Sequence, residues 1–248
     1  MAASTDAAGA HAGAIALLWD RRATPRRGPT PGLSLGMIAQ AGISIADADG
    51  LAAVTMQRVA AALGVTKMAL YRYVPGKAEL VALMIDIGIG EAPRSGGAAG
   101  DWRPRLDRWA RQMFSRFWQH PWALEATVGS RAIGPNELGW MEEAVAALAG
   151  TGLDGGEMLD VAATLAGHVR AIAQQRSALA DGHPERAMEA AIAALLRGRE
   201  ERFPALQAAL GSAAGHGAQG MALDFGLARI LDGVGLLIAS RAQAQSPP

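Results

Sequence analysis

The spacing of apolar residues along the chain predicts helices and gives little indication of strands. Runs of alternating β-branched residues are scarce, whereas half of the residues are hydrophobic. Helical spacing is clear in the apolar residues Leu35, Ile38, Gly42 and Ile45. Gly50 is placed to end this helix, because glycine readily adopts the left-handed conformation of a C-terminal cap. We therefore expect an all-α protein.

Two short helices and one longer helix are predicted next. Thr55 and Thr66 are placed as N-caps, because a threonine hydroxyl accepts hydrogen bonds from the free N–H groups of a first helical turn. Gly64 separates the two short helices, and the Pro-Gly pair at 75–76 precedes a longer helix over about 77–89. The inward side of the first short helix carries Val59, Ala60 and Leu63.

We divide the chain into residues 1–32, 33–80 and 81–248, and its composition marks a domain boundary near residues 90–100. Residues 1–13 are predicted to be disordered and 15–19 to form a short helical turn. Gly, Ala, Pro and Ser dominate residues 90–100, which predicts a linker or mobile loop. Beyond it, amphipathic segments lie at about 101–119, 122–131, 136–149, 155–181, 184–200, 202–211 and 221–242. Residues 211–220 are predicted to form a loose loop.

Charge and cysteine content exclude several classes of protein. The formal net charge is zero, but residues 20–85 contain eight basic residues against four acidic ones. A local basic excess is typical of a nucleic-acid contact surface and also of an ordinary solvated face. The absence of cysteine excludes disulfides and thiolate metal sites, and fits a cytoplasmic protein. No apolar stretch is long enough to span a membrane, so we expect no membrane partner.

The two short helices around Gly64 have the pattern of a helix-turn-helix, in which a tight glycine-containing turn joins two helices. Ala60 is the small residue expected where the helices meet, and Val65 is the apolar residue that holds their angle. The alternative is an ordinary helical hairpin whose Tyr71 and Tyr73 are half-buried packing residues.

Residues 51–80 decide between these interpretations. They contain Val-Ala-Ala-Ala-Leu-Gly-Val followed by Leu-Tyr-Arg-Tyr-Val and Pro-Gly-Lys, and this run resembles the DNA-binding domain of the tetracycline-repressor (TetR) family. Residues 225–234 and 27–35 resemble the last helix and the N-terminal arm of the subgroup with a tetracycline-repressor-like effector domain. The resemblance implies an N-terminal three-helix DNA-binding domain at 33–80, after a flexible basic extension, and a larger C-terminal effector-binding and dimerisation domain at 81–248.

The resemblance also implies a function and a set of DNA contacts. The expected function is a transcriptional repressor that a small, apolar effector releases from a palindromic double-stranded DNA operator. The residues implied in DNA binding are Thr55, Met56, Gln57, Thr66, Lys67, Met68, Ala69, Tyr71, Arg72, Tyr73 and Lys77. Residues 66–69 would begin the recognition helix, where base edges are read in the major groove. Within them, Lys67 suits a guanine, whereas Met68 and Ala69 suit thymine methyl groups.

Other contacts are expected around these bases. Tyr71, Tyr73 and Lys77 would contact phosphates, which position the helix without reading the sequence. The four arginines between positions 21 and 27 form either a solvated tail or an arm that reaches the minor groove.

A tryptophan-rich segment is the candidate effector pocket. The candidate residues are Trp109, Met113, Trp118, Trp122, Trp140 and His168. Large aromatic side chains line apolar ligand cavities, but they also fill helical cores, and core packing is the favoured interpretation of any single tryptophan. His168 lies in a long apolar helix, where a structural partner is favoured over a ligand contact.

The last helix is expected to support a homodimer together with the helix at 155–181. Its candidate interface residues are Leu227, Ile230, Val234 and Leu237. We find no metal-ligand spacing, phosphate loop or catalytic constellation, so we predict no metal, no cofactor and no enzymatic activity. The rival interpretations are an effector-independent DNA-binding protein and an all-helical enzyme or carrier.

Overall fold

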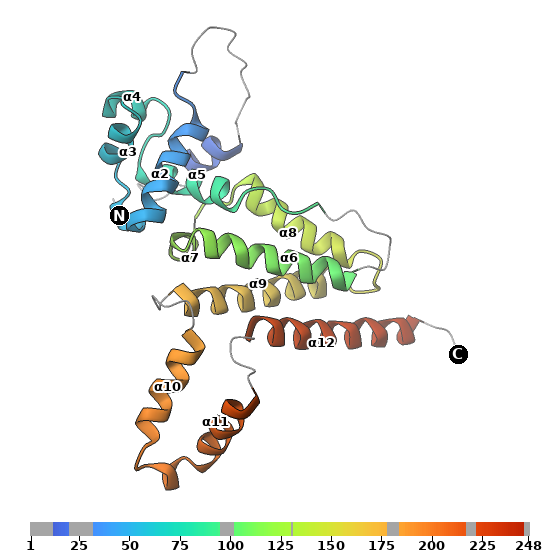
Figure 1. Ribbon diagram of the computed structural model, residues 1–248. Coiled ribbons are helices and arrows are strands. Elements are labelled where there is room, and N and C mark those ends of the chain that lie inside the picture. Colours follow the sequence, from blue (N-terminus) through green and yellow to red (C-terminus); the bar gives the residue numbers. More distant parts are fainter. Residues whose placement is uncertain are drawn as a thin grey trace, which may run out of the picture. The chain divides into compact units, whose positions relative to one another are not determined.

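The computed structural model describes residues 12–19, 32–94, 102–129, 131–177, 184–216 and 222–245, and it contains helices and no strands in these ranges. Residues 12–19 form the first helix. The elements that follow are α2 (Leu35–Asp49), η1 (Leu51–Ala53), α3 (Met56–Ala62), α4 (Lys67–Tyr71), α5 (Lys77–Ile89), α6 (Trp102–Gln119), α7 (Trp122–Ala126), α8 (Pro135–Leu148), α9 (Gly155–Ser177), α10 (Pro184–Leu196), η2 (Glu200–Arg202), α11 (Pro204–His216) and α12 (Ala222–Gln245) (Figure 1). The predicted all-α class is confirmed.

The helices pack as two compact units that divide after Thr151. The first unit contains the helices through α8, and the second contains α9 to α12. The predicted boundary between residues 80 and 81 falls inside α5, whose Leu80, Leu83 and Met84 are fully buried. Helix α5 packs against α2 at one side and against α6, α7 and α8 at the other. It is therefore the element that connects the predicted DNA-binding helices to those that follow.

Helix α2 has the predicted bounds and the predicted buried face. Gly50 ends it with a φ of 81°, and its N–H donates to the carbonyl oxygen of Ala46 at 2.9 Å. A Cβ on Gly42 would lie 2.6 Å from the sulfur of Met84, so this glycine lets α2 and α5 pack closely. Of the four residues on the predicted inward face, Ile38, Gly42 and Ile45 are buried and Leu35 is half-buried.

The helix at residues 12–19 is a correction to the predicted disorder, which was expected to extend to residue 13. Ala14 and Leu18 are buried, and the indole N–H of Trp19 donates to the carbonyl oxygen of Ile133 at 3.0 Å. This order depends on a partner 114 residues away, which a local composition argument does not detect. Residues 1–11 and 20–31, with the arginine-rich stretch, lie outside the described residues.

Several predicted element bounds were wrong. Helix α7 ends at Ala126 and not near 131, and Gly129 turns the chain beyond it at a φ of 88°. Helix α10 ends at Leu196 and not near 200, and Gly198 follows it at a φ of 75°. Helix α11 continues to His216, although residues 211–220 were predicted to form a loop. The alanines within 211–216 favour helix enough to offset the two glycines there.

In the second unit, α9 and α12 pack side by side (Figure 1). A reciprocal pair of hydrogen bonds begins α9: the N–H of Asp154 donates to Glu157 at 3.0 Å, and the N–H of Glu157 donates to Asp154 at 2.9 Å. Glu157 also pairs with Arg241 on α12. The hydrogen bond from Arg241, and then the one from the Asp154 backbone, lower the pKa of Glu157 below its usual value.

Candidate DNA-binding surface and its connection to the following helices

Local hydrogen bonds form the α3–α4 pair as the sequence predicted. The hydroxyl of Thr55 accepts from the N–H of Arg58 at 3.1 Å, and the hydroxyl of Thr66 accepts from the N–H of Ala69 at 3.2 Å. Gly64 turns the chain between the helices at a φ of 65°, a conformation that favours glycine. Both predicted caps and the predicted turn are therefore present.

Buried side chains and one backbone bond fix the angle between α3 and α4. Val59, Ala60 and Leu70 are buried, and Leu70 has no exposed surface. The N–H of Val65 donates to the carbonyl oxygen of Ala60 at 3.0 Å. A short α4 anchored through Leu70 presents its opposite face to solvent.

Most of the residues that were expected to contact DNA are exposed, and they lie on α4 and at the starts of α3 and α5. Met68 is 74% exposed, and Tyr71 is 37% exposed. The ammonium of Lys67 lies 5.6 Å from the centre of the Tyr71 ring, so these two side chains share one side of the helix. The other expected contact residues that are exposed are Thr55, Gln57, Thr66, Arg72 and Lys77. Ala69 and Tyr73 are half-buried.

Met56 is the exception among the expected contact residues. It is 7% exposed and packs inward with Val59 and Ala60. Because residues three and four positions apart share a helix face, Met56 lies on the same face as these two core residues. Its side chain is therefore buried in this conformation, and its role in DNA binding stays a prediction.

An ion pair that the sequence analysis missed holds α3 against the end of α2. Arg58 on α3 pairs with Asp49 in the last turn of α2. The pair is half-exposed, so its contribution to stability is small, about 0–1 kcal/mol. It nevertheless fixes where the Arg58 guanidinium lies.

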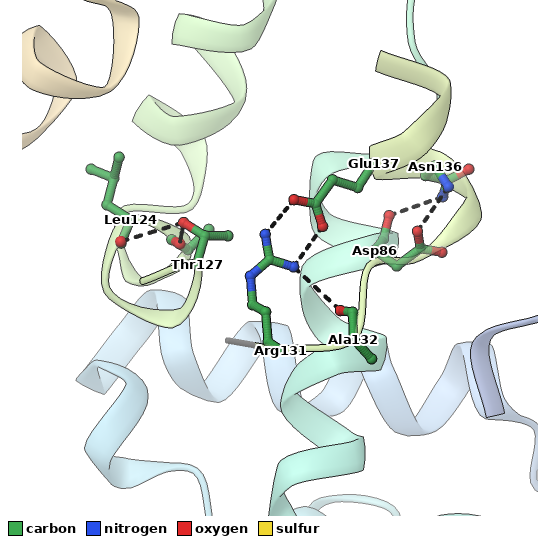
Figure 2. A network of polar contacts seen from close by, with 8 residues as sticks. Asp86, Leu124, Thr127, Arg131, Ala132, Asn136 and Glu137 are labelled. Atoms are coloured by element: carbon green, nitrogen blue, oxygen red, sulfur yellow. Dashed lines mark hydrogen bonds and ion pairs between the residues drawn. The ribbon is translucent and has the colours of Figure 1, made fainter. Parts of the chain in front are cut away.

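Helix α5 is joined to the start of α8 through Asp86 (Figure 2). The backbone N–H of Asn136 donates to Asp86 Oδ1 at 2.8 Å, and the side-chain amide of Asn136 donates to the carbonyl oxygen of Asp86 at 2.9 Å. The carboxylate thereby occupies the N-terminal end of α8, where helix N–H groups need acceptors. A Cβ on Gly134 would overlap the Asp86 side chain, so only glycine fits there. Arg131 and Glu137 form an ion pair in the same region.

A second junction joins α2 to the turn between α6 and α7, which we call the α6–α7 corner (residues 119–122). The indole N–H of Trp122 donates to Asp47 Oδ1 at 2.7 Å, and His120 Nδ1 lies 2.9 Å from the same oxygen. Asp47 belongs to the last turn of α2. The two donors are 75 and 73 residues away in the chain, so this junction is formed only by the tertiary fold.

The candidate effector residues of the first unit lie in different environments. Trp109 and Trp140 are buried edge to face with ring centres 6.0 Å apart, and the Trp109 indole donates to the Trp140 carbonyl oxygen at 2.8 Å. The indole of Trp122 is bound to Asp47, whereas Trp118 is 43% exposed. Met113 is half-buried. The structure thus brings Trp109 and Trp140 together as core, and their role in effector binding stays a prediction.

A cleft of about 260 Å³ opens beside α8. Its lining residues are Glu91, Ala92, Arg94, Pro135, Asn136, Gly139, Glu142 and Glu143. None of the candidate effector residues lines this cleft, and its lining is more polar than the predicted apolar pocket.

Two family models match the chain. The model described as bacterial regulatory proteins of the tetR family matches residues 38–84, and the model described as tetracyclin repressor-like, C-terminal domain, matches residues 93–238. The HTH-type transcriptional repressor DrrR1 of Streptomyces coeruleorubidus is 34% identical over 254 residues, which cover 98% of this chain and 92% of that protein. The chain belongs to the tetracycline-repressor family.

Solved structures of ActR from Streptomyces coelicolor share this TetR-family fold. Apo ActR has a TM-score of 0.70 at 24% identity, covering 87% of this chain and 99% of ActR. ActR in complex with actinorhodin has a TM-score of 0.67 at 25% identity, covering 82% of this chain and 96% of ActR. The α3–α4 pair is therefore the helix-turn-helix of a DNA-binding transcriptional regulator, as predicted, and not an ordinary hairpin.

The predicted dimer residues of this TetR-family chain are divided between two faces of α12. Leu227 and Val234 are buried within the subunit, and their role in a dimer interface stays a prediction. Ile230 and Leu237 are partly exposed. The largest exposed apolar side chains of α12 are instead Phe225 and Leu236, at 66% and 75%.

His168 lies in the second unit, at the seam between α9 and α12. Its ring occupies the position that a Cβ on Gly226 would need, and its Nε2 lies 3.4 Å from the carbonyl oxygen of Leu223. This contact matches the structural partner that was favoured for it. A role in effector binding stays a prediction.

No group of three His, Asp or Glu residues in the described ranges lies close enough to hold a metal ion. Within the same ranges, no helix is long and apolar enough to cross a membrane.

Proposed function

We propose that this TetR-family regulator binds a palindromic operator as a homodimer, represses transcription in the cytoplasm, and is released by a small, largely apolar molecule. The observation that carries the proposal is the geometry of α4, whose start is exposed at Met68 while Leu70 anchors it. DrrR1, the relative at 34% identity, is a transcriptional repressor. The structure of ActR has been solved in complex with actinorhodin. This complex supports the proposal that the present protein also responds to a small molecule.

The exposed residues divide into those that read bases and those that hold phosphates. Met68 and Ala69 offer apolar surface to thymine methyl groups in the major groove. Lys67 and Tyr71 lie on the same side of α4. Both side chains are therefore directed toward the same part of the DNA, either its backbone or a guanine next to it. Lys77 begins α5, where free backbone N–H groups add to its attraction for a phosphate. The base contacts give specificity, and the phosphate contacts give affinity.

The exposed sides of α9 and α12 are the proposed dimer interface. Phe225 and Leu236 on α12 and Leu159 on α9 are each at least half exposed. Apolar residues of this size on two adjacent long helices form the kind of surface that a symmetry mate covers. A two-fold dimer places two recognition helices one DNA turn apart, about 34–36 Å, so the operator is expected to be palindromic.

A mobility-shift and footprinting experiment on the region upstream of the protein's own gene tests operator binding. We expect one protected palindromic site, bound at least about 10³-fold more tightly than unrelated DNA at physiological salt. Lys67→Ala lowers affinity for that site, whereas Arg108→Ala, which removes an exposed cation on α6, leaves it unchanged. Binding that shows no preference for any upstream sequence contradicts the proposal.

The alternative of effector-independent DNA binding has a separate test. Actinorhodin, the compound in the ActR complex, is the first probe, followed by other small aromatic compounds. Release of the operator together with a change in tryptophan fluorescence supports a ligand-responsive repressor. An effector-independent protein keeps its operator in the presence of every compound.

A further inference from the structure

One carboxylate oxygen joins the helix-turn-helix unit to the helices that follow α5. Asp47 Oδ1 lies 2.7 Å from the Trp122 indole nitrogen and 2.9 Å from His120 Nδ1. Trp122 is 4% exposed, and its indole N–H has Asp47, an exposed residue at the end of α2, as its acceptor. Because the indole N–H of Trp122 hydrogen-bonds to Asp47, the two side chains are expected to move together.

Helix α5 packs against this junction. A Cβ on Gly88 would lie 3.4 Å from the Trp122 ring and 3.6 Å from His120 Cδ2, so both rings pack directly against α5. The His120 and Trp122 ring centres are 5.9 Å apart. The α6–α7 corner is thus held between Asp47 on α2 and Gly88 on α5, and it has little room to move without displacing one of them.

The last turn of α2 extends the connection to the DNA-binding surface. Asp47 bonds to the α6–α7 corner, and Asp49, two residues later, pairs with Arg58 on α3. A displacement of the corner that carries Asp47 with it therefore moves the segment that also holds α3. Since α3 packs on α4, the recognition helix shifts as well.

We propose that Asp47 is a positioning residue that couples the DNA-binding helices to the effector domain through its hydrogen bonds to Trp122 and His120. The proposal rests on the operator binding argued above. Coupling between two sites requires a contact that differs between two states of the protein, and it acts in both directions. DNA binding at α4 is then expected to tighten the α6–α7 corner, without any effector being present.

Hydrogen exchange of the full-length protein, with and without its operator, tests this. In the wild type, operator DNA slows exchange in the helix-turn-helix and also in residues 119–127, there by about fivefold or more, the lower end of typical coupling. In Asp47→Ala the helix-turn-helix remains protected, but the slowing in residues 119–127 is lost. Asp47→Asn keeps an acceptor oxygen at the same place and is expected to behave as the wild type.

Two further variants separate coupling from general damage. Gln40→Ala removes an exposed polar side chain from the same helix and leaves both carboxylates in place, and it is expected to keep the protection of residues 119–127. Trp122→Phe keeps an aromatic ring but removes the indole donor, and it is expected to lose that protection as Asp47→Ala does. Thermal unfolding followed by circular dichroism verifies that each variant is folded. If Asp47→Ala does not fold, Trp122→Phe alone tests the role of this hydrogen bond.

The outcomes distinguish this inference from the proposed function. Protection of the helix-turn-helix with unchanged protection of residues 119–127 in both Asp47→Ala and Trp122→Phe overturns the role of Asp47. Loss of that protection in Asp47→Asn, to the same extent as in Asp47→Ala, overturns it too, because an acceptor oxygen is still present. If operator DNA protects neither region in the wild type, the proposed operator binding itself fails, and the coupling with it.

Discussion

The helix-turn-helix and the junctions around α5 are held by contacts of opposite kinds. The caps of α3 and α4 each join residues three positions apart, through Thr55 and Thr66. The junctions join residues 50 to 75 positions apart, through Asp86 and Asp47. Local contacts form one rigid reading unit, whereas long-range contacts decide how that unit is attached. The attachment can therefore change while the reading unit stays intact.

This difference also explains where a ligand can act. A molecule that disturbed the capped α3–α4 pair would have to unfold it, since Leu70 and Val59 have no exposed surface. The junctions consist of a few hydrogen bonds at helix ends, whose rearrangement leaves the helices themselves in place. Population shifts between two such arrangements need only the differential affinity of the ligand for them.

Gly134→Ala is expected to have the largest effect on stability, because it disrupts the long-range junction at Asp86. The added methyl overlaps the Asp86 side chain and separates it from the N-terminal end of α8. Overpacking and the loss of a buried hydrogen bond together are expected to cost about 2–5 kcal/mol of unfolding free energy. Urea unfolding followed by circular dichroism measures it.

Gly139→Ala is the matched control on the same helix, since nothing lies within 4 Å of its added methyl. Alanine in a helix interior is expected to stabilise by about 0.5–1 kcal/mol relative to glycine. Equal effects of the two variants would contradict the importance of the Asp86 junction.

Thr66→Ala is expected to have an intermediate effect, because it removes a local contact. The hydroxyl that accepts from the N–H of Ala69 is lost, which is expected to destabilise α4 by about 1 kcal/mol. The same urea unfolding curves measure it. Thr164→Ala, an exposed threonine within α9, controls for the change of side chain and is expected to be neutral or slightly stabilising. A larger loss in Thr66→Ala than in Gly134→Ala would reverse the comparison between local and long-range contacts.

Glu157 is expected to show the smallest effect, and it combines both kinds of contact in one side chain. It closes the local cap with Asp154 and pairs with Arg241, 84 residues away. Because its pKa is lowered in the folded state, chiefly by the hydrogen bond from Arg241, its ionised form stabilises the fold above the unfolded-state pKa of about 4.3. That stabilisation is lost as the pH falls through the lower folded-state pKa.

The comparison of Glu157→Gln with the wild type across pH measures this contribution. Glutamine keeps an acceptor for the Asp154 N–H and removes the charge opposite Arg241. We expect the variant to be less stable than the wild type at pH 7, and the difference to shrink as the pH falls through the folded-state pKa of Glu157. Glu142→Gln on α8 serves as the control for removing one carboxylate. A difference that did not shrink at low pH would show that the local cap, and not the charge, was altered.

The parts of the fold that the sequence predicted are those with signals close in the chain. Thr55, Thr66, Gly64 and Gly50 act through their own backbone conformation or through a residue three or four positions away, so their roles were predictable. The helix at 12–19 was predicted only as a turn at 15–19, and its contact with Ile133, 114 positions away, was not predictable. The prediction of a loop at 211–220 was wrong for residues 211–216, which are helical. Alanine favours a helix there in spite of the neighbouring glycines.

In the candidate site, too, long-range contacts were not predicted, although two features of the sequence indicate how its residues are placed. Met56 shares a helix face with Val59 and Ala60, and this spacing alone indicates an inward side chain. Asp47 and Asp49 both lie in the last turn of α2, where the helix dipole disfavours carboxylates. Two acidic residues in such a place indicate partners elsewhere in the fold, although the sequence does not say which.

The exposed tip of α4 has a consequence for how DNA recognition depends on ionic strength. Cations such as Lys67 and Lys77 displace counterions from DNA when they approach phosphates, so the affinity that they supply falls steeply as salt rises. Met68, 74% exposed and uncharged, displaces none. Under the proposed function, discrimination at a base pair contacted by Met68 would therefore be carried by a contact that salt does not screen.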